Sequence, residues 1–190
     1  KSVDRFLPSY KPRFQLDLAN PCAFNQLAPP NIYMEMRHNI QMAMDEAFTF
    51  FEQMEEEFDT ILGRRHGSVE AIRCDDAEVI LITSGTVTST SRQVVANLRE
   101  KGEKVGLLKV RLYRPFSTQH FLETLPDTTK RIAVLDRTKE TAAFGEPLYL
   151  DVTTILHDNK KNIDIVGGRY GLGSKEFTPV MAKSVFDNLR

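Results

Sequence analysis

Residues 79–110, VILITSGTVTSTSRQVVANLREKGEKVGLLKV, contain the pattern that decides the fold class. Two short β-rich runs, 79–83 and 105–112, flank the stretch 88–101, whose apolar residues recur at helical spacing. A third β-rich run follows at 132–135. Strands and helices that alternate in this way predict an α/β sheet.

The flanking sequence extends the same alternation. Residues 63–77 alternate after their glycines and predict a short strand at a sheet edge, and 118–125 predict a short helix. The apolar segment 148–156 predicts a helix, 163–166 a further strand, and 178–189 a closing helix that begins with Thr-Pro. Together these segments predict one α/β core.

The N-terminal part of the chain has a different character. Residues 1–30 contain five prolines and predict an extended, proline-rich arm or linker. Residues 31–62 then predict a long amphipathic helix that ends at Gly63, with methionine and phenylalanine on more than one side. Such residues favour burial against neighbours on two faces. We expect 31–190, the helix followed by the α/β core, to form a single domain.

The composition bounds the partners of the chain. Its 25 basic and 26 acidic residues give a formal net charge of -1 and are spread along 190 residues, so we expect no nucleic-acid partner. The most apolar runs are strand-sized, far below the roughly 20 residues that span a bilayer, and we expect no membrane association. The chain begins at Lys1 without a secretory leader. We expect a fragment of a longer cytoplasmic protein.

Metal-ligating and nucleophilic residues show no pattern of an active site. Cys22 and Cys74 stand far apart, and the four histidines have no partner at metal-ligand spacing. The serine clusters lack the Gly-x-Ser-x-Gly elbow of hydrolases. The sequence therefore predicts no metal site, no disulfide and no catalytic residue in this chain.

The turn at 84–91, rich in serine and threonine, is one candidate binding site. Ser84 and Thr86 stand where a strand meets a helix N-terminus, where hydroxyls and free backbone amides could hold a phosphate or carboxylate. The turn lacks both the Gly-x-Gly-x-x-Gly and the P-loop fingerprints. A plain helix cap is the simpler alternative.

Three arginines near predicted strand ends are candidate contacts with other domains. Arg114 lies in an Arg-Pro turn, Arg137 lies in the mixed-charge segment 136–140, and Arg169 lies with Lys175 in the last glycine-rich loop. Arginine pairs with interface carboxylates as readily as with phosphates, so Arg169 and Lys175 are also candidate contacts for a phosphorylated ligand. Within 136–140 we expect the opposite charges to pair with one another.

Several stretches, taken in order, resemble one enzyme family. They are GEKVGLLKVRLYRPFS at 102–117, IAVLDRTKE at 132–140, GEPLYLDV at 145–152 and VGGRYGLGSKEFTP at 166–179. The segment from YMEMR at 33–37 to AMDEA at 43–47 is similar to the α-subunit version of the same family. The chain resembles domain II, or the corresponding α-subunit region, of pyruvate:ferredoxin (flavodoxin) oxidoreductases. GGRYGL is closer to the single-chain form, and the split-subunit form stays open.

The resemblance implies a three-layer α/β/α sandwich like the C-terminal domain of transketolase, preceded by the arm and the long amphipathic helix. It implies a parent enzyme that oxidatively decarboxylates a 2-oxoacid to an acyl-CoA and reduces ferredoxin or flavodoxin. Thiamine diphosphate, magnesium and iron–sulfur clusters belong to that whole enzyme, and we expect none on this chain.

The role expected for the chain itself is structural. We expect it to be inactive alone, to pack against the remaining domains or subunits, and to form part of an oligomer. Two alternatives stay open: a domain that contacts CoA or phosphate in the same enzyme, and a free-standing, non-enzymatic interaction domain.

Overall fold

The computed structural model of the chain describes residues 2–7, 9–23 and 27–189. Residues 1, 8 and 24–26 of the predicted arm, and residue 190, lie outside this part. The chain divides into two compact units, Lys1–His66 and Gly67–Arg190. The long helix thus belongs to the same unit as the arm. The division into an arm at 1–30 and a domain at 31–190 stays a prediction.

The first unit contains helix α1, Ser2–Phe6, and helix α2, Pro30–Leu62. Helix α1 corrects the prediction that residues 1–30 are extended throughout. Its five residues precede the first proline, so no proline ring interrupts them. Helix α2 starts with Pro30, whose fixed φ suits a first turn. It ends at Gly63, which adopts φ 69° and donates its N–H to the carbonyl of Asp59 at 2.7 Å.

Helix α2 has no buried residue, although all of its residues are described. Phe6 of α1 packs edge-to-face on Phe58, with 5.2 Å between the ring centroids. Met34 and Phe50 remain 76% and 64% exposed. Among the described residues of the first unit, the burial on two faces that the sequence favours is not seen.

The second unit is built around a five-stranded sheet in the order β1-β3-β2-β4-β5. The strands are β1 (Val69–Ile72), β2 (Val79–Ser84), β3 (Val105–Val110), β4 (Arg131–Asp136) and β5 (Asp164–Arg169). Strand β2 pairs in parallel with β3 and β4, β4 pairs in parallel with β5, and β1 runs antiparallel to β3. The predicted edge position of the first short strand is confirmed.

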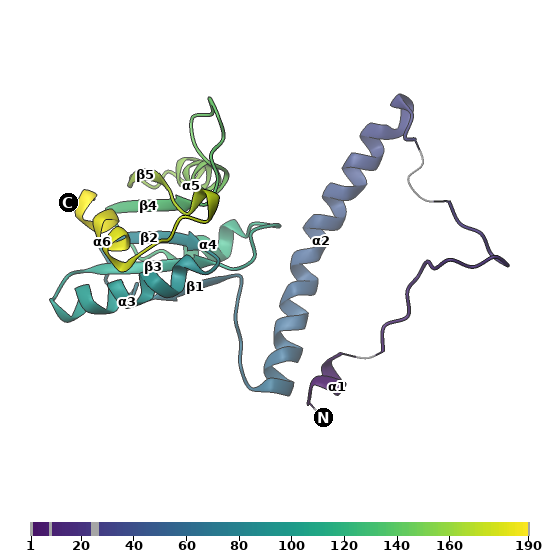
Figure 1. Cartoon of the computed structure of the whole chain (residues 1–190), viewed down its shortest axis with the longest axis horizontal. Coiled ribbons are helices and arrows are strands. Elements are labelled where there is room, and N and C mark those ends of the chain that lie inside the picture. The colour runs from purple at the N-terminus through teal and green to yellow at the C-terminus, as the bar shows by residue number, and fades with distance from the viewer. Residues whose placement is uncertain (1, 8, 24–26, 190) are drawn as a thin grey trace. The chain divides into compact units, whose positions relative to one another are not determined.

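Helices cover both faces of this sheet (Figure 1), with α3 and α6 on one face and α4 and α5 on the other. They are α3 (Val87–Glu100), α4 (Thr118–Thr124), α5 (Pro147–Asp158) and α6 (Pro179–Asn188). Alternation along β2 explains the two layers, because Ile80 and Ile82 join the core under α4 and α5 whereas Leu81 joins the core under α3 and α6. The predicted three-layer α/β/α sandwich is confirmed.

Strand β5 differs from its prediction. The sequence pattern ends the strand at residue 166 and opens a glycine-rich loop, whereas the structure continues the strand through Gly167, Gly168 and Arg169. These glycines allow close packing: an added Cβ at Gly167 would lie 3.0 Å from the Tyr149 ring, and one at Gly168 would lie 2.6 Å from Leu135 Cδ2. Close approach of neighbouring side chains therefore explains both glycines.

Candidate functional site

The carboxyl ends of β2 and β4 form a topological switch point. From β2 the chain passes through α3 to β3 on one side, and β4 lies on the other side of β2. Ligands of open α/β sheets bind in the crevice outside such strand ends. The fold thus directs attention to the turns that follow these two strands.

A cavity of about 520 Å³ lies at this switch point. Its polar side comes from the ends of β2 and β4, and its apolar side comes from the start of α5 and two tyrosines. Its lining includes Ser84, Thr86, Tyr113, Leu135, Arg137 and Tyr170. The sequence candidates Ser84 and Thr86 are therefore brought together with Arg137.

A second cavity, of about 220 Å³, has Thr86, Arg137 and Tyr170 in its lining as well. It adds Thr90 from α3 and Lys175 from the segment after β5. Lys175 and Arg137 thus border one hollow, and Arg137 borders both.

Thr86 is the N-cap residue of α3, as the simpler interpretation of the turn requires. Its hydroxyl, however, makes no capping hydrogen bond. The first turn of α3 also contains no acidic side chain. Two amides of the first turn donate to backbone carbonyls instead, Thr88 N–H to Gly85 at 3.4 Å and Ser89 N–H to Thr86 at 3.0 Å.

Asp136 at the end of β4 has a structural partner. Its carboxylate accepts hydrogen bonds from the backbone N–H groups of Leu148 at 3.0 Å and Tyr149 at 3.1 Å, in the first turn of α5. The residue is only 7% exposed, and burial raises the pKa of its carboxyl while the two N–H donors act in the opposite direction. Asp136 thus caps α5 across a 12-residue separation.

Arg137 points to a different partner. Its Nε donates to the carbonyl of Gly171 at 3.1 Å. Gly171 adopts φ 63°, and an added Cβ there would lie 3.2 Å from the same Nε. The expected mutual pairing within 136–140 is wrong, because Asp136 is used by α5 and Arg137 by this backbone carbonyl.

Arg169 and Lys139 meet at the carboxylate of Glu146. Arg169 Nε lies 2.5 Å from Glu146 Oε1, and Lys139 Nζ lies 3.3 Å from the same oxygen. The hydrogen bond from Arg169 holds the pKa of Glu146 below its ordinary value. Arg169 and Lys175 also border a cavity of about 330 Å³, but the Nε of Arg169 is already paired.

Arg114 is held within the second unit. Its Nη2 lies 2.7 Å from Asp151 Oδ2, and its guanidinium stacks 4.0 Å from the centroid of the Tyr113 ring. Burial, and then the hydrogen bond and charge of Asp151, raise the pKa of Tyr113 to about 12. Contact of Arg114, Arg137 or Arg169 with another domain stays a prediction.

Two residues of the site were not found from the sequence, Tyr113 and Tyr170. The hydroxyl of Tyr170 donates to the carbonyl of Ser84 at 3.4 Å, and its ring packs on Phe177 with 5.3 Å between the centroids. The convergence of parallel strand ends was the available signal, since both tyrosines follow strands.

The comparisons with known proteins now identify the family. Residues 77–181 match the family described as pyruvate:ferredoxin oxidoreductase core domain II. The chain belongs to this family. The matched range begins between β1 and β2 and extends into α6. It therefore includes the switch point and both of its cavities.

Relatives of domain II are parts of much longer proteins. The chain is 49% identical over 160 residues to pyruvate:ferredoxin oxidoreductase of Moorella thermoacetica, covering 84% of this chain and 14% of that protein. It is 37% identical over 185 residues to pyruvate synthase subunit PorA of Methanothermobacter thermautotrophicus, covering 97% of this chain and 47% of that subunit. The chain thus spans less than half the length of either relative.

A solved structure of 2-oxoglutarate:ferredoxin oxidoreductase from Magnetococcus marinus, with 2-oxoglutarate, coenzyme A and succinyl-CoA bound, is a more distant likeness. It matches 76% of this chain and 23% of its own chain, with 17% identity and a TM-score of 0.47. The oxidoreductase family itself is established by the sequence matches.

The donor set of the chain does not fit an iron–sulfur cluster. Cys74 is buried, its thiol lies 3.5 Å from the carbonyls of Ile72 and Leu107, and burial raises its pKa, which disfavours the thiolate that a cluster requires. Cys22 is exposed and belongs to the other unit. Over the described ranges, no three His, Cys, Asp or Glu side chains gather as metal ligands, and no helix is long and apolar enough to cross a bilayer.

Proposed function

We propose that this chain is a packing and assembly domain of a longer 2-oxoacid:ferredoxin or flavodoxin oxidoreductase. The parent enzyme oxidatively decarboxylates a 2-oxoacid, with pyruvate the first candidate, to an acyl-CoA and passes the electrons to ferredoxin or flavodoxin. The observation that carries the proposal is the identity of 49% over most of this chain but only 14% of the Moorella protein.

The exposed side chains of α2 support an assembly role. A solvent-exposed helix ordinarily keeps its large apolar residues on one covered stripe. Here Met34, Met42 and Phe50 are 76%, 49% and 64% exposed. Exposed apolar side chains in this number mark an interaction surface. The remaining domains or subunits of the parent enzyme are the proposed partners of α2.

Polar contacts with those partners are proposed for the arginines at the carboxyl end of the sheet. The side chains of Arg114 and Arg169 are 50% and 44% exposed even though each already pairs with one carboxylate. A guanidinium has five N–H donors, so each of these groups can accept a further carboxylate from a neighbouring domain.

Thiamine diphosphate, magnesium and the iron–sulfur clusters belong to the proposed parent enzyme and are held by its other parts. Thiamine diphosphate would stabilise the carbanion formed on decarboxylation, and the clusters would carry the electrons. We assign those steps to the other parts of the parent enzyme. A cytoplasmic location is part of the same proposal.

The experiment starts from the native protein. An antibody against this chain isolates the full-length product, which is assayed for pyruvate- and CoA-dependent reduction of a low-potential viologen dye beside the 21.7 kDa chain alone. We expect a much larger active protein and an inactive chain. If the native product is no larger than the chain and is inactive, the proposal of a longer parent enzyme is refuted. The alternative of a free-standing interaction domain then remains.

The assembly role has its own test in the full-length enzyme. We expect Met34→Gln combined with Phe50→Gln to shift sedimentation toward smaller species and to lower activity in proportion. Gln53→Ala, a polar and exposed position on the same helix, is the matched control. Unchanged sedimentation of the double variant contradicts the role of α2 in assembly.

A further inference from the structure

We propose that the cavities at the switch point bind a phosphate ester of the nucleotide class, with its phosphoryl group between Arg137 and Lys175. This site is separate from the assembly role proposed for α2, because its lining residues all belong to the second unit. The proposal rests on the charges, the donors and the shape of two adjoining hollows.

The basic side chains at this site differ from several others near the sheet that have carboxylate partners, including Arg92 and Arg111 with Glu70. In the described part of the chain, neither Arg137 nor Lys175 forms an ion pair. Two cations that border one cavity of about 220 Å³ repel each other, and a bound anion removes that repulsion.

The geometry of Arg137 suits an anion. Its Nε is fixed by the carbonyl of Gly171 at 3.1 Å, which orients the guanidinium and leaves the Nη groups as donors. An arginine fork oriented in this way binds phosphate oxygens in a bidentate manner. The positive φ of Gly171 is part of this arrangement, since a Cβ there would crowd the same Nε.

Neutral polar residues also lie at this position. Thr86 and Thr90, each with a hydroxyl group, line the smaller cavity, and Thr86 also lines the larger one. The start of α3, a 14-residue helix, has no side-chain cap and no acidic side chain in its first turn, and the amides of Thr88 and Ser89 donate to backbone carbonyls. The corresponding end of α5 already receives the carboxylate of Asp136, so one of the two helix N-termini at the switch point binds an anion within the chain itself.

The larger cavity defines the rest of the ligand. Its volume of about 520 Å³ lies in the range of small-molecule sites, roughly 300–1,000 Å³. Tyr113 and Tyr170 offer aromatic surface, and Leu135 and Leu148 offer apolar surface. A flat, uncharged ring attached to the phosphate fits this lining, because aromatic side chains bind bases by stacking without sequence-specific hydrogen bonds. A nucleotide combines these features.

The experiment uses the full 190-residue chain, labelled with ¹⁵N, and ADP, CoA, dephospho-CoA and inorganic phosphate as probes. We expect ADP and CoA to shift the amide signals of Gly85, Thr86, Thr138 and Gly171 in a saturable manner. Arg137→Gln and Lys175→Gln should each weaken binding at least tenfold. Arg92→Gln is the matched control, because it removes a positive charge from α3 at a residue that does not line either cavity. This variant should bind ADP and CoA as tightly as the natural chain.

The probes also identify the source of the phosphate. Equal affinity for ADP and CoA supports a general adenine-nucleotide site, and tighter binding of CoA than of dephospho-CoA supports recognition of the 3′-phosphate. The proposal is overturned if no probe gives saturable shifts at these amides. It is equally overturned if Arg137→Gln, shown to be folded by circular dichroism, binds ADP as tightly as the natural chain.

Discussion

Truncation of Phe121 tests the packing of the sandwich most directly. Phe121 is fully buried, is the only buried residue of α4 and packs against Phe116 with 5.8 Å between the ring centroids. Helix α4 has seven residues, too few to be stable without tertiary contacts. Phe121→Ala therefore removes the most deeply buried contact between α4 and the core.

The magnitude follows from the buried area. A buried phenylalanine removes roughly 150–250 Å² from water, worth about 4–6 kcal/mol at 25 cal/mol per Å², of which the remaining alanine retains a part. Phe→Ala changes in cores cost about 3–5 kcal/mol, so we expect a loss of about 4 kcal/mol. For a unit of roughly 120 residues with an unfolding entropy of about 2.1 cal/mol/K per residue, this loss lowers Tm by about 15 °C.

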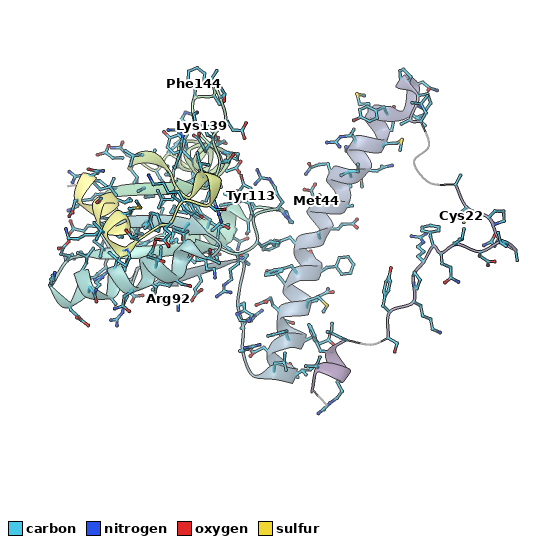
Figure 2. All side chains as sticks on the ribbon, in the orientation of Figure 1. Cys22, Met44, Arg92, Tyr113, Lys139 and Phe144 are labelled. Atoms are coloured by element: carbon cyan, nitrogen blue, oxygen red, sulfur yellow. The ribbon has the colours of Figure 1, made fainter. Side chains whose placement is uncertain are left out.

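The assay is urea unfolding followed by tyrosine fluorescence and circular dichroism. Phe144→Ala is the matched control, because Phe144 is fully exposed, at 104%, on the loop between β4 and α5, where Figure 2 shows it at the tip. We expect the control to change the free energy of unfolding by less than about 0.5 kcal/mol. A loss below about 1 kcal/mol for Phe121→Ala, or an equal loss for both variants, refutes the packing described for α4.

Three further outcomes follow from the second unit. Spectrophotometric titration should find one phenol, Tyr113, with a pKa of about 12, and Asp151→Asn should lower it; uniform titration near pH 10 contradicts this. The lowered pKa of Glu146 stabilises the fold above the ordinary glutamate pKa of about 4.3, and this contribution is lost as pH falls through the lower folded-state value. Glu146→Gln should therefore flatten the loss of stability between pH 7 and 3 in urea titrations, and an unchanged slope counts against the ion pair. Gly106→Ala should cost about 1–3 kcal/mol in the same assay, because its Cβ would lie 2.9 Å from Cys74 Sγ, and a neutral result shows that this site relaxes freely.

The alternation of strands and helices was predictable because it depends on local periodicity. The run 79–83 became β2 and 148–156 became α5 with shifts of one or two residues at their ends. Gly167 and Gly168 were misassigned to a loop, since the sequence cannot show that Tyr149 and Leu135 pack against their backbone.

The candidate site was predictable only in part, because its partners are distant in sequence. Ser84, Thr86 and Lys175 follow from strand ends and glycine-rich segments. The sequence does not show which of Arg137 and Arg169 has a carboxylate partner. In the structure Glu146 binds Arg169 across 23 residues, and the Gly171 carbonyl binds Arg137 across 34. The spacing of charges along 136–140 predicted ion pairs within this segment, whereas Asp136 and Arg137 bind groups that are distant in sequence.

The two edge strands of the sheet bear on how copies of this domain behave at high concentration. Strand β1 has only four residues, and β5 carries Gly167 and Gly168 between a charged residue at each end, Asp164 and Arg169. Short edges, glycines and terminal charges are features that discourage strand-to-strand addition and fibril formation. The two edges of the sheet therefore discourage aggregation through strand addition when the chain is produced alone.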